Sequence, residues 1–207
     1  MLVFALVGAL LTAQAPRPSP AVSPPVASDA VVETAQGRFV IRLLPEIAPR
    51  HVQHFAKTAR AGGYDGTTFH RIIPHGIIQG GDPLSKDPAK ATLYGTGGLG
   101  LLKAEFSDRP MSRGAVAAVL RPSSKDSAGN QFFICLSDQA ALTGKFTIFG
   151  EVVEGMDVAD TLTSVYGESS GGGIRAGKQQ PLFDGGNAYL DREYPRLDRI
   201  IRAQVIP

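Results

Sequence analysis

The apolar residues of this sequence come in short runs separated by glycine, proline and other turn-forming residues, and this pattern limits the folds open to the chain. Apolar runs of about four to eight residues between turn signals are typical of strands, whereas helices need longer periodic segments. Glycine supplies 24 and proline 15 of the 207 residues, and 19% of the residues are charged. This composition favours strands and turns over long helices, so we expect a mainly β domain.

The runs predict a series of short strands. Residues 31–44 contain two β-rich runs on either side of Gly37, which is the pattern of a hairpin. Residues 67–79 are expected to form two strands broken near Pro74. Further strands are expected at 115–120, 131–136, 146–153 and 200–206. Many short strands with few helices predict a closed barrel or a sandwich.

Two segments have helical periodicity instead. After Pro49, apolar residues recur at helical spacing from Val52 to Ala59, and glycines at 62 and 63 end the segment. Proline suits the first turn of a helix because its missing amide would have no partner there. Residues 156–165 are expected to form a second, shorter helix.

The first 28 residues differ in kind from the rest. Residues 1–11 are apolar apart from Gly8, and an A-x-A pattern ends at Ala15, which predicts a signal peptide over residues 1–15. The apolar stretch is too short for a stable membrane span, and it lacks the usual preceding Lys or Arg; a buried N-terminal strand is the alternative. Residues 16–28 contain five prolines and predict a semi-rigid linker. Residues 29–207 remain as one domain, and we expect an exported protein, periplasmic or secreted.

Several function classes are disfavoured by simple counts. One cysteine cannot form a disulfide scaffold, and Cys135 lies in an apolar run where it is expected to be a small core residue. A net charge of +2 gives no reason to predict nucleic acid or an anionic membrane as partner. His51 and His54 are expected on the solvent side of the first helix, with no convergent carboxylates to complete a metal site.

Residues 95–100 match the pattern G-x-G-x-x-G of dinucleotide-binding loops. That pattern needs a strand before it and a helix after it, and residues 85–92 are polar and turn-like. We therefore expect a flexible surface loop, and no cofactor.

The remaining candidates for chemistry lie in two segments. Arg71 and Gln79 are eight residues apart, separated by a strand-like apolar stretch with a turn. The second segment begins at Gln131 and continues through residues 142–150. On chemistry alone, Arg71 could equally be a surface charge.

Together these segments resemble the cyclophilin-type peptidyl-prolyl cis-trans isomerases. The resemblance begins near Val31 and includes the runs 64–71, 131–135 and 149–156, and it fades after about Val165. It implies an eight-stranded antiparallel β-barrel closed by two helices, with no metal or organic cofactor. It also implies that the partners are proline-containing segments of unfolded or folding proteins.

The resemblance assigns roles to individual residues. Arg71 is the catalytic donor to the twisted peptide bond, and Gln79 holds Arg71 and touches the substrate backbone. Phe133, Leu142 and Ile77 form the proline socket. The remaining substrate-binding residues implied are Gln131, Phe146, Val119, Leu120 and His70, the last expected to make a structural hydrogen bond behind the site.

The sequence also departs from the family pattern. Gly76 and Ala141 stand where many members carry larger side chains, Phe146 stands where many carry His, and the loop over residues 121–129 is longer. We expect an exported prolyl isomerase that assists folding and acts as a monomer, with no stable membrane span and no nucleic acid partner. The alternatives are a peptide-binding chaperone or scaffold with weak or no catalysis, and a structural domain whose residues 166–187 dock a partner.

Overall fold

The computed structural model describes residues 29–73, 75–162 and 198–206. The predicted signal peptide, the proline-rich linker and the segment 166–187 lie outside the described residues. Within the described part of the chain, no helix is long and apolar enough to cross a membrane.

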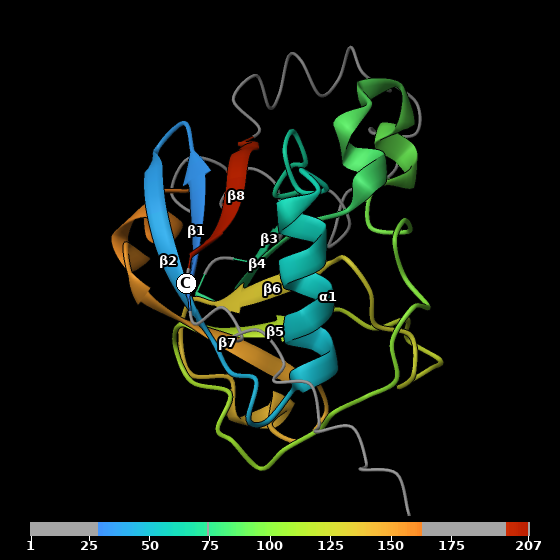
Figure 1. Ribbon diagram of the computed structural model, residues 1–207, viewed down its shortest axis with the longest axis vertical. Coiled ribbons are helices and arrows are strands. Elements are labelled where there is room, and N and C mark those ends of the chain that lie inside the picture. Colours follow the sequence, from blue (N-terminus) through green and yellow to red (C-terminus); the bar gives the residue numbers. More distant parts are fainter. Residues whose placement is uncertain (1–28, 74, 163–197, 207) are drawn as a thin grey trace, which may run out of the picture.

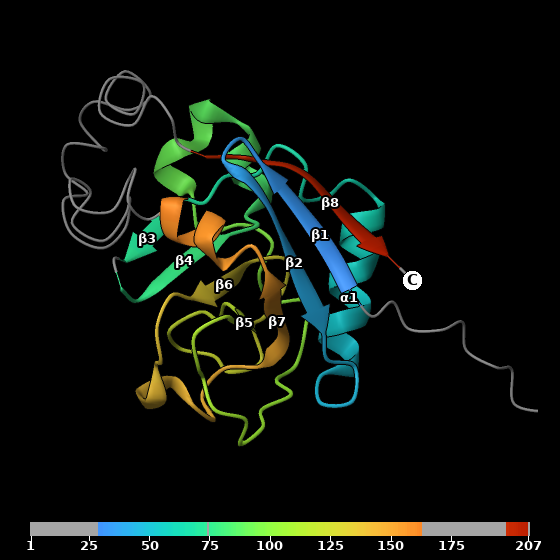
Figure 2. The same cartoon turned by 90° about the vertical axis from the view of Figure 1, so that its left-hand side faces the viewer.

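The described strands form a single eight-stranded antiparallel sheet (Figure 1). Its spatial order is β3-β4-β6-β5-β7-β2-β1-β8, and Figure 2 shows the strands side by side in this order. Each expected strand is present, within a few residues of its predicted bounds. The strands are β1 Asp29–Thr34, β2 Gly37–Leu43, β3 Arg71–Ile73, β4 Ile77–Gly80, β5 Ala115–Ala118, β6 Phe132–Cys135, β7 Ile148–Glu154 and β8 Ile200–Ile206.

The sheet curls into a half-barrel, so the expected closed barrel overstates its closure. Among the described residues, the two edges meet where the segment before β3 contacts the start of β8: Ile200 N donates to Thr67 O at 2.7 Å, Gly66 N donates to Ile200 O at 2.7 Å and Phe69 N donates to Asp198 O at 3.0 Å. The reason is length, because β3 has three residues and β8 has seven. A full ladder between the two edges would need a longer β3.

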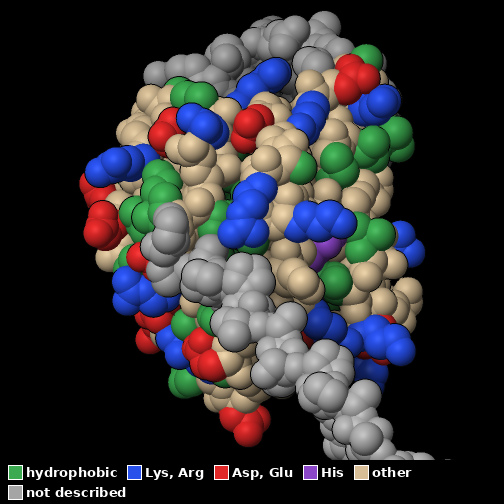
Figure 3. Space-filling view, viewed as in Figure 1, with side chains coloured by type: hydrophobic (Ala, Val, Ile, Leu, Met, Phe, Trp, Pro, Cys, Tyr) green, Lys and Arg blue, Asp and Glu red, His purple; other side chains and the backbone are tan. Residues whose placement is uncertain are grey.

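Helix α1, Pro49–Arg60, lies across the sheet and packs against β8 and β7 (Figure 1). Its buried face includes Val52, Phe55 and Ala59, as the periodicity predicted. Residues 156–162 form the second helix up to the end of that described range. Three short 3-10 helices complete the elements: η1 Pro83–Lys86, η2 Pro88–Leu93 and η3 Ala140–Leu142. On the α1 side the surface is mainly polar and charged, with hydrophobic side chains in scattered groups (Figure 3).

The sheet buries apolar side chains on both faces, and the candidate site lies on the outer face. Along β6, Phe132 and Ile134 point into the half-barrel, while Phe133 and Cys135 point to the opposite face. The inner core includes an aromatic group of Phe55, Phe132 and Phe149. The outer cluster is smaller and is centred on Phe133. Consecutive residues of β6 therefore serve two separate apolar clusters.

His51 is buried, which contradicts its expected place on the solvent side of α1. Its side chain is 3% exposed, and its Nδ1 lies 2.6 Å from Oε2 of Glu105. The same carboxylate accepts from the backbone amides of Arg50 and His51, so it caps a helix whose own N-cap residue, Ala48, offers no side chain. A partner 54 residues away in sequence thus decides where His51 points.

Both members of this pair have shifted pKa values. Burial lowers the pKa of His51 and outweighs the raising effect of Glu105, so the neutral imidazole donates its Nδ1–H at neutral pH. Burial alone would raise the pKa of Glu105, but hydrogen bonds from His51 and Arg50 outweigh it and lower that pKa. The pair is therefore a neutral donor on a carboxylate, and protonation of His51 opposes folding.

We predict that His51→Gln flattens the pH dependence of stability. The unfolded chain binds a proton at His51 near pH 6.5, whereas the folded chain does so only at lower pH, so the wild-type free energy of unfolding falls as pH drops below about 6.5. The slope from this group is at most about 1.4 kcal/mol per pH unit. Chemical denaturation from pH 7.5 to 5 measures it. His75→Gln, at an exposed histidine, is the control, and equal slopes for wild type and His51→Gln would contradict the prediction.

Candidate active site

The register of the sheet brings the predicted site residues into one row. Arg71 on β3 pairs with Gln79 on β4, Gln79 pairs with Phe133 on β6, and Phe133 pairs with Ala117 on β5. Paired side chains share a face, and neighbouring strands lie about 4.8 Å apart. A guanidinium, an amide and an aromatic ring therefore stand in sequence across the outer face. The small Ala117 leaves space beside the ring.

A directional chain of hydrogen bonds fixes the polar end of this row. Arg71 Nη1 donates to Gln79 Oε1 at 3.2 Å, and Gln79 Nε2 donates to Gln131 Oε1 at 3.0 Å. Gln131 Nε2 in turn donates to Gly97 O at 2.7 Å and to Asp82 Oδ2 at 3.3 Å. Every bond runs from the guanidinium towards the Asp82 carboxylate. Bonds aligned in this way polarise one another, so the relay orients Arg71.

Asp82 ends the relay and is a residue that the sequence interpretation missed. Its side chain is fully buried, and its carboxylate accepts from the backbone amides of Leu84, Gly95 and Gly97 as well as from Gln131. These donors compensate the buried charge. The only sequence signal is the turn Gly80-Gly81-Asp82-Pro83, which is equally typical of an ordinary loop.

The glycine loop over residues 95–100 lies at the surface, as expected, but it is also tied by hydrogen bonds to the buried end of the relay. Its amides hold Asp82, and Asn130 N donates to Gly98 O at 2.7 Å. A side chain at Gly97 would begin 2.4 Å from Asp82 Oδ1, and one at Gly129 would begin 2.0 Å from Gly98 O. Glycine is required at both places for close packing.

The residues predicted to form the proline socket lie together in one apolar cluster. Phe133 and Ile77 are buried, and Leu142 and Phe146 pack against them half-buried. The rings of Phe133 and Phe146 meet edge to face, with centroids 5.2 Å apart. Leu142 comes from η3 and the other residues from the sheet or its flanks, so the socket has a rigid floor and an aliphatic rim.

Met111 is a further member of this cluster that the sequence interpretation missed. It is 1% exposed, and its backbone amide donates to Thr143 Oγ1 at 3.1 Å, which ties it to the turn after Leu142. No motif marked Met111, because it follows a proline in an irregular segment. A flexible thioether there can fill the space behind the socket.

His70 lies beneath Gln79 and is buried, in line with the structural hydrogen bond expected of it. It is 1% exposed, and its Nε2 accepts from Gln79 Nε2 at 3.3 Å. Its ring meets Tyr94 edge to face with centroids 6.5 Å apart. His70 thus supports Gln79 from the buried side, and its place among the substrate-binding residues stays a prediction.

Val119 and Leu120 line an open groove of about 630 Å³ that shares Arg71 and Gln79 with the relay. Val119 N donates to Gln131 O at 3.0 Å, which fixes this wall to the polar row. Gly95, Thr96 and Leu99 of the glycine loop also line the groove. The groove gives an extended chain a path beside the socket.

Two of the departures from the family pattern can be placed in the structure. A side chain at Gly76 would begin 2.8 Å from Cγ2 of Ile73, so Ile73 occupies that space and itself packs against the socket cluster. Ala141 is exposed beside Leu142 and leaves the rim low there.

Cys135 is a core residue, as expected. It is fully buried, and burial together with the charge of Asp138 raises the pKa of its thiol to about 12. Such a thiol is not a nucleophile at neutral pH. Among the described residues, no group of three or more His, Cys, Asp or Glu side chains could hold a metal ion.

Comparison with known proteins identifies the family. The sequence pattern of the cyclophilin type peptidyl-prolyl cis-trans isomerase/CLD family matches residues 30–181, which extends beyond the point where the resemblance was expected to fade. A probable peptidyl-prolyl cis-trans isomerase of Brucella suis is 37% identical over 161 residues, covering 75% of this chain and 78% of that protein. An Arabidopsis thaliana peptidyl-prolyl cis-trans isomerase is 35% identical over 146 residues, covering 70% of this chain and 85% of that protein.

The fold agrees with solved structures. The crystal structure of a Cryptosporidium parvum cyclophilin type peptidyl-prolyl cis-trans isomerase, obtained in the presence of the dipeptide Ala-Pro, superposes with a TM-score of 0.67 at 22% identity. The superposition covers 86% of this chain and 99% of the Cryptosporidium parvum chain. The chain belongs to the cyclophilin-type peptidyl-prolyl cis-trans isomerase family, and it is an isomerase of proline-containing peptides.

We predict that Gln79 and Gln131 are energetically coupled in catalysis. Gln79→Ala and Gln131→Ala each break the relay at the same hydrogen bond, so the double variant should lose less activity than the product of the two single losses. The expected coupling is about 0.5–1.5 kcal/mol, measured from kcat/KM on a proline tetrapeptide. Gln53→Ala, at an exposed position of α1, is the control. Independent losses that multiply would show that the relay does not orient Arg71.

Proposed function

We propose that this isomerase acts outside the cytoplasm, where it accelerates rotation about X-Pro bonds in exported polypeptides and so assists their folding. It works as a monomer in this proposal. The observation that carries the catalytic part is the Arg71 guanidinium, held by Gln79 at one end of a row whose other end is the Phe133 socket. The predicted leader over residues 1–15 is what supports export.

The chemistry needs no bond breaking. Rotation about a peptide bond costs about 18–20 kcal/mol because amide resonance is lost. The cis and trans forms of X-Pro differ by about 0.5–1 kcal/mol and exchange over tens to hundreds of seconds without a catalyst. At the twisted geometry the prolyl nitrogen gains a localised lone pair. A donor placed at that nitrogen lowers the barrier because it binds the twisted form better than either planar form.

Arg71 supplies that donor in our mechanism. Its guanidinium is charged at all relevant pH values and presents several N–H groups in one plane. The ring of the proline enters the cluster of Phe133, Leu142 and Ile77, where water is excluded and the hydrogen bond to nitrogen is strengthened. Gln79 both anchors Arg71 and faces the substrate backbone.

We predict that Arg71→Ala lowers kcat/KM for a proline tetrapeptide roughly 10²- to 10³-fold, the usual effect of removing one transition-state donor. The change in kcat/KM is obtained from the rate of cis-to-trans exchange of the tetrapeptide with each protein. Arg38→Ala, an exposed arginine on β2, should retain wild-type activity. Equal rates for wild type and Arg71→Ala would contradict the assignment of Arg71 as the catalytic donor.

A peptide-holding chaperone on the same fold is the second candidate, and the exposed Ala141 at the socket rim favours it because a low rim holds the proline ring less firmly. The same Arg71→Ala variant separates the two functions. Under the holding function it still suppresses aggregation of an unfolding client protein, whereas under the isomerase function it no longer accelerates refolding limited by proline isomerisation.

We predict that the full chain, expressed in a Gram-negative bacterium, is cleaved after Ala15 and recovered in the periplasm or medium. Small residues at positions 13 and 15 satisfy the cleavage site, so the variant Ala13→Asp, Ala15→Asp should accumulate uncleaved. Cell fractionation and intact-protein mass measure the result. Uncleaved wild-type protein found only in the cytoplasm would contradict the proposed export.

A further inference from the structure

The groove next to Arg71 and Gln79 has an electrostatic character that the isomerase chemistry does not require. Among the described residues that line it, the charged ones are Arg71 and Arg121, and none is Asp or Glu. Thr96 and Ser123 add hydroxyl groups, while Leu99, Leu120 and Pro122 supply apolar walls. The charge on the described lining of the groove is therefore entirely positive.

Arg121 is held in place from its backbone outwards. Its amide donates to Ser127 Oγ at 2.8 Å, and its carbonyl accepts from Ser124 N at 3.1 Å, which closes a tight turn. Ser127 Oγ donates to Ser124 O at 2.6 Å, and Ser127 O accepts from Gly100 N at 2.7 Å. The lengthened loop is thus hydrogen-bonded to the end of the glycine loop at Gly100.

The guanidinium of Arg121 contacts that segment. Its Nη2 donates to Leu99 O at 3.3 Å, and it lies over Gly100, where a Cβ would come within 3.4 Å of Nη2. Gly100 has a φ of +86°, which favours glycine and so keeps the space open. The contact with Leu99 uses one of five N–H donors, and no carboxylate in the described part of the chain forms an ion pair with Arg121.

We infer that Arg121 makes this groove a subsite for a carboxylate side chain, so that the enzyme prefers substrates with Asp or Glu close to the isomerised proline. The inference rests on the proposed function. A peptide whose proline sits in the Phe133 socket passes Arg71 and Gln79 and continues along the groove that these residues share with Arg121. A planar guanidinium pairs with a carboxylate through two parallel hydrogen bonds.

This contact is expected to act on binding and not on rotation. The acidic side chain is remote from the twisting bond, so Arg121 binds it equally in the planar and twisted forms. Such uniform binding lowers KM and leaves kcat unchanged. Because Arg121 is exposed, the attraction is screened by salt and is strongest at low ionic strength.

The test compares proline pentapeptides that differ at one position. Glu, Gln or Lys is placed one or two residues before the proline, or one or two residues after it, and KM and kcat are measured at low and high salt. We expect Glu to lower KM about two- to fivefold relative to Gln at one of these positions, Lys to raise it, and high salt to reduce both effects. Equal KM values for Glu and Gln at every position overturn the inference.

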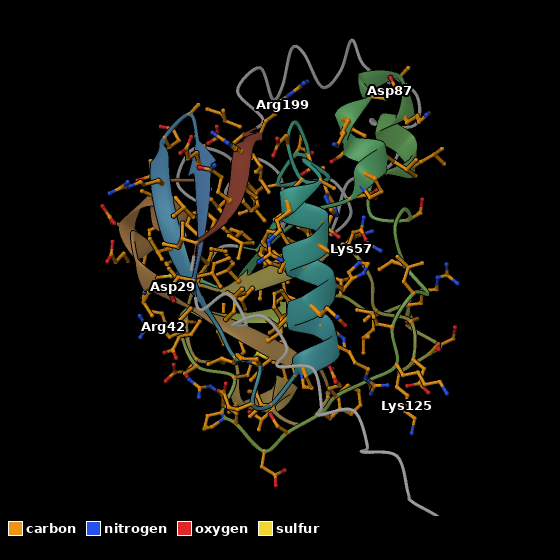
Figure 4. The ribbon with its side chains drawn as sticks, viewed as in Figure 1. Asp29, Arg42, Lys57, Asp87, Lys125 and Arg199 are labelled. Carbon is orange, nitrogen blue, oxygen red and sulfur yellow. The ribbon has the colours of Figure 1, made fainter. Side chains whose placement is uncertain are left out.

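The variants assign the preference to its residue. Arg121→Glu should reverse the order of Glu and Lys peptides, while Lys125→Glu, which makes the same charge change on the outer edge of the same loop, should keep the wild-type order (Figure 4). A preference that survives in Arg121→Glu, or that Lys125→Glu reverses equally, overturns the subsite. If no peptide is isomerised at all, the proposed function fails. The subsite is then tested separately by NMR titration, which compares the affinities of the Glu and Gln peptides.

Discussion

The burial of the Asp82 carboxylate is the constraint on which the site depends. An isolated charge inside a protein is costly, so its oxygens must find donors, and here three backbone amides and the Gln131 side chain supply them. Satisfying Asp82 folds the glycine loop onto the sheet and sets the orientation of Gln131. Gln131 then sets Gln79, and Gln79 sets Arg71. The orientation of Arg71, at the half-buried end of the relay, therefore depends on the donors that the buried Asp82 requires.

The sheet was largely predictable from the sequence because its signals are local. Apolar runs between turn residues identified the strands, and the spacing of Arg71 and Gln79 placed both on paired strands. The curl of the sheet was less predictable, because closure depends on the length of β3 and on how its edge meets β8. The two faces of β6 were also hidden, since a continuous apolar run does not tell which side chains line a core and which line a site.

What the sequence could not reveal depends on contacts between distant segments. The periodicity of α1 put His51 on the solvent side, but Glu105 draws it inwards and caps the helix at the same time. Asp82 had the appearance of a turn residue, because its donors come from residues that are close only in the folded chain. Met111 belongs to no periodic segment and enters the outer cluster only through the turn at Thr143.

The two-sided burial of β6 has a consequence for how this enzyme could diversify. Phe132 and Ile134 are buried in the inner core, and Phe133 and Cys135 are buried in the outer cluster. Each side chain of the strand therefore packs against neighbours that restrict its substitution. The loop over residues 121–129 is secured by its own serine and by backbone bonds to the neighbouring segment, independently of strand register. Substitutions in this loop can therefore change which peptides the enzyme prefers, while the residues of β6 that contribute to catalysis stay the same.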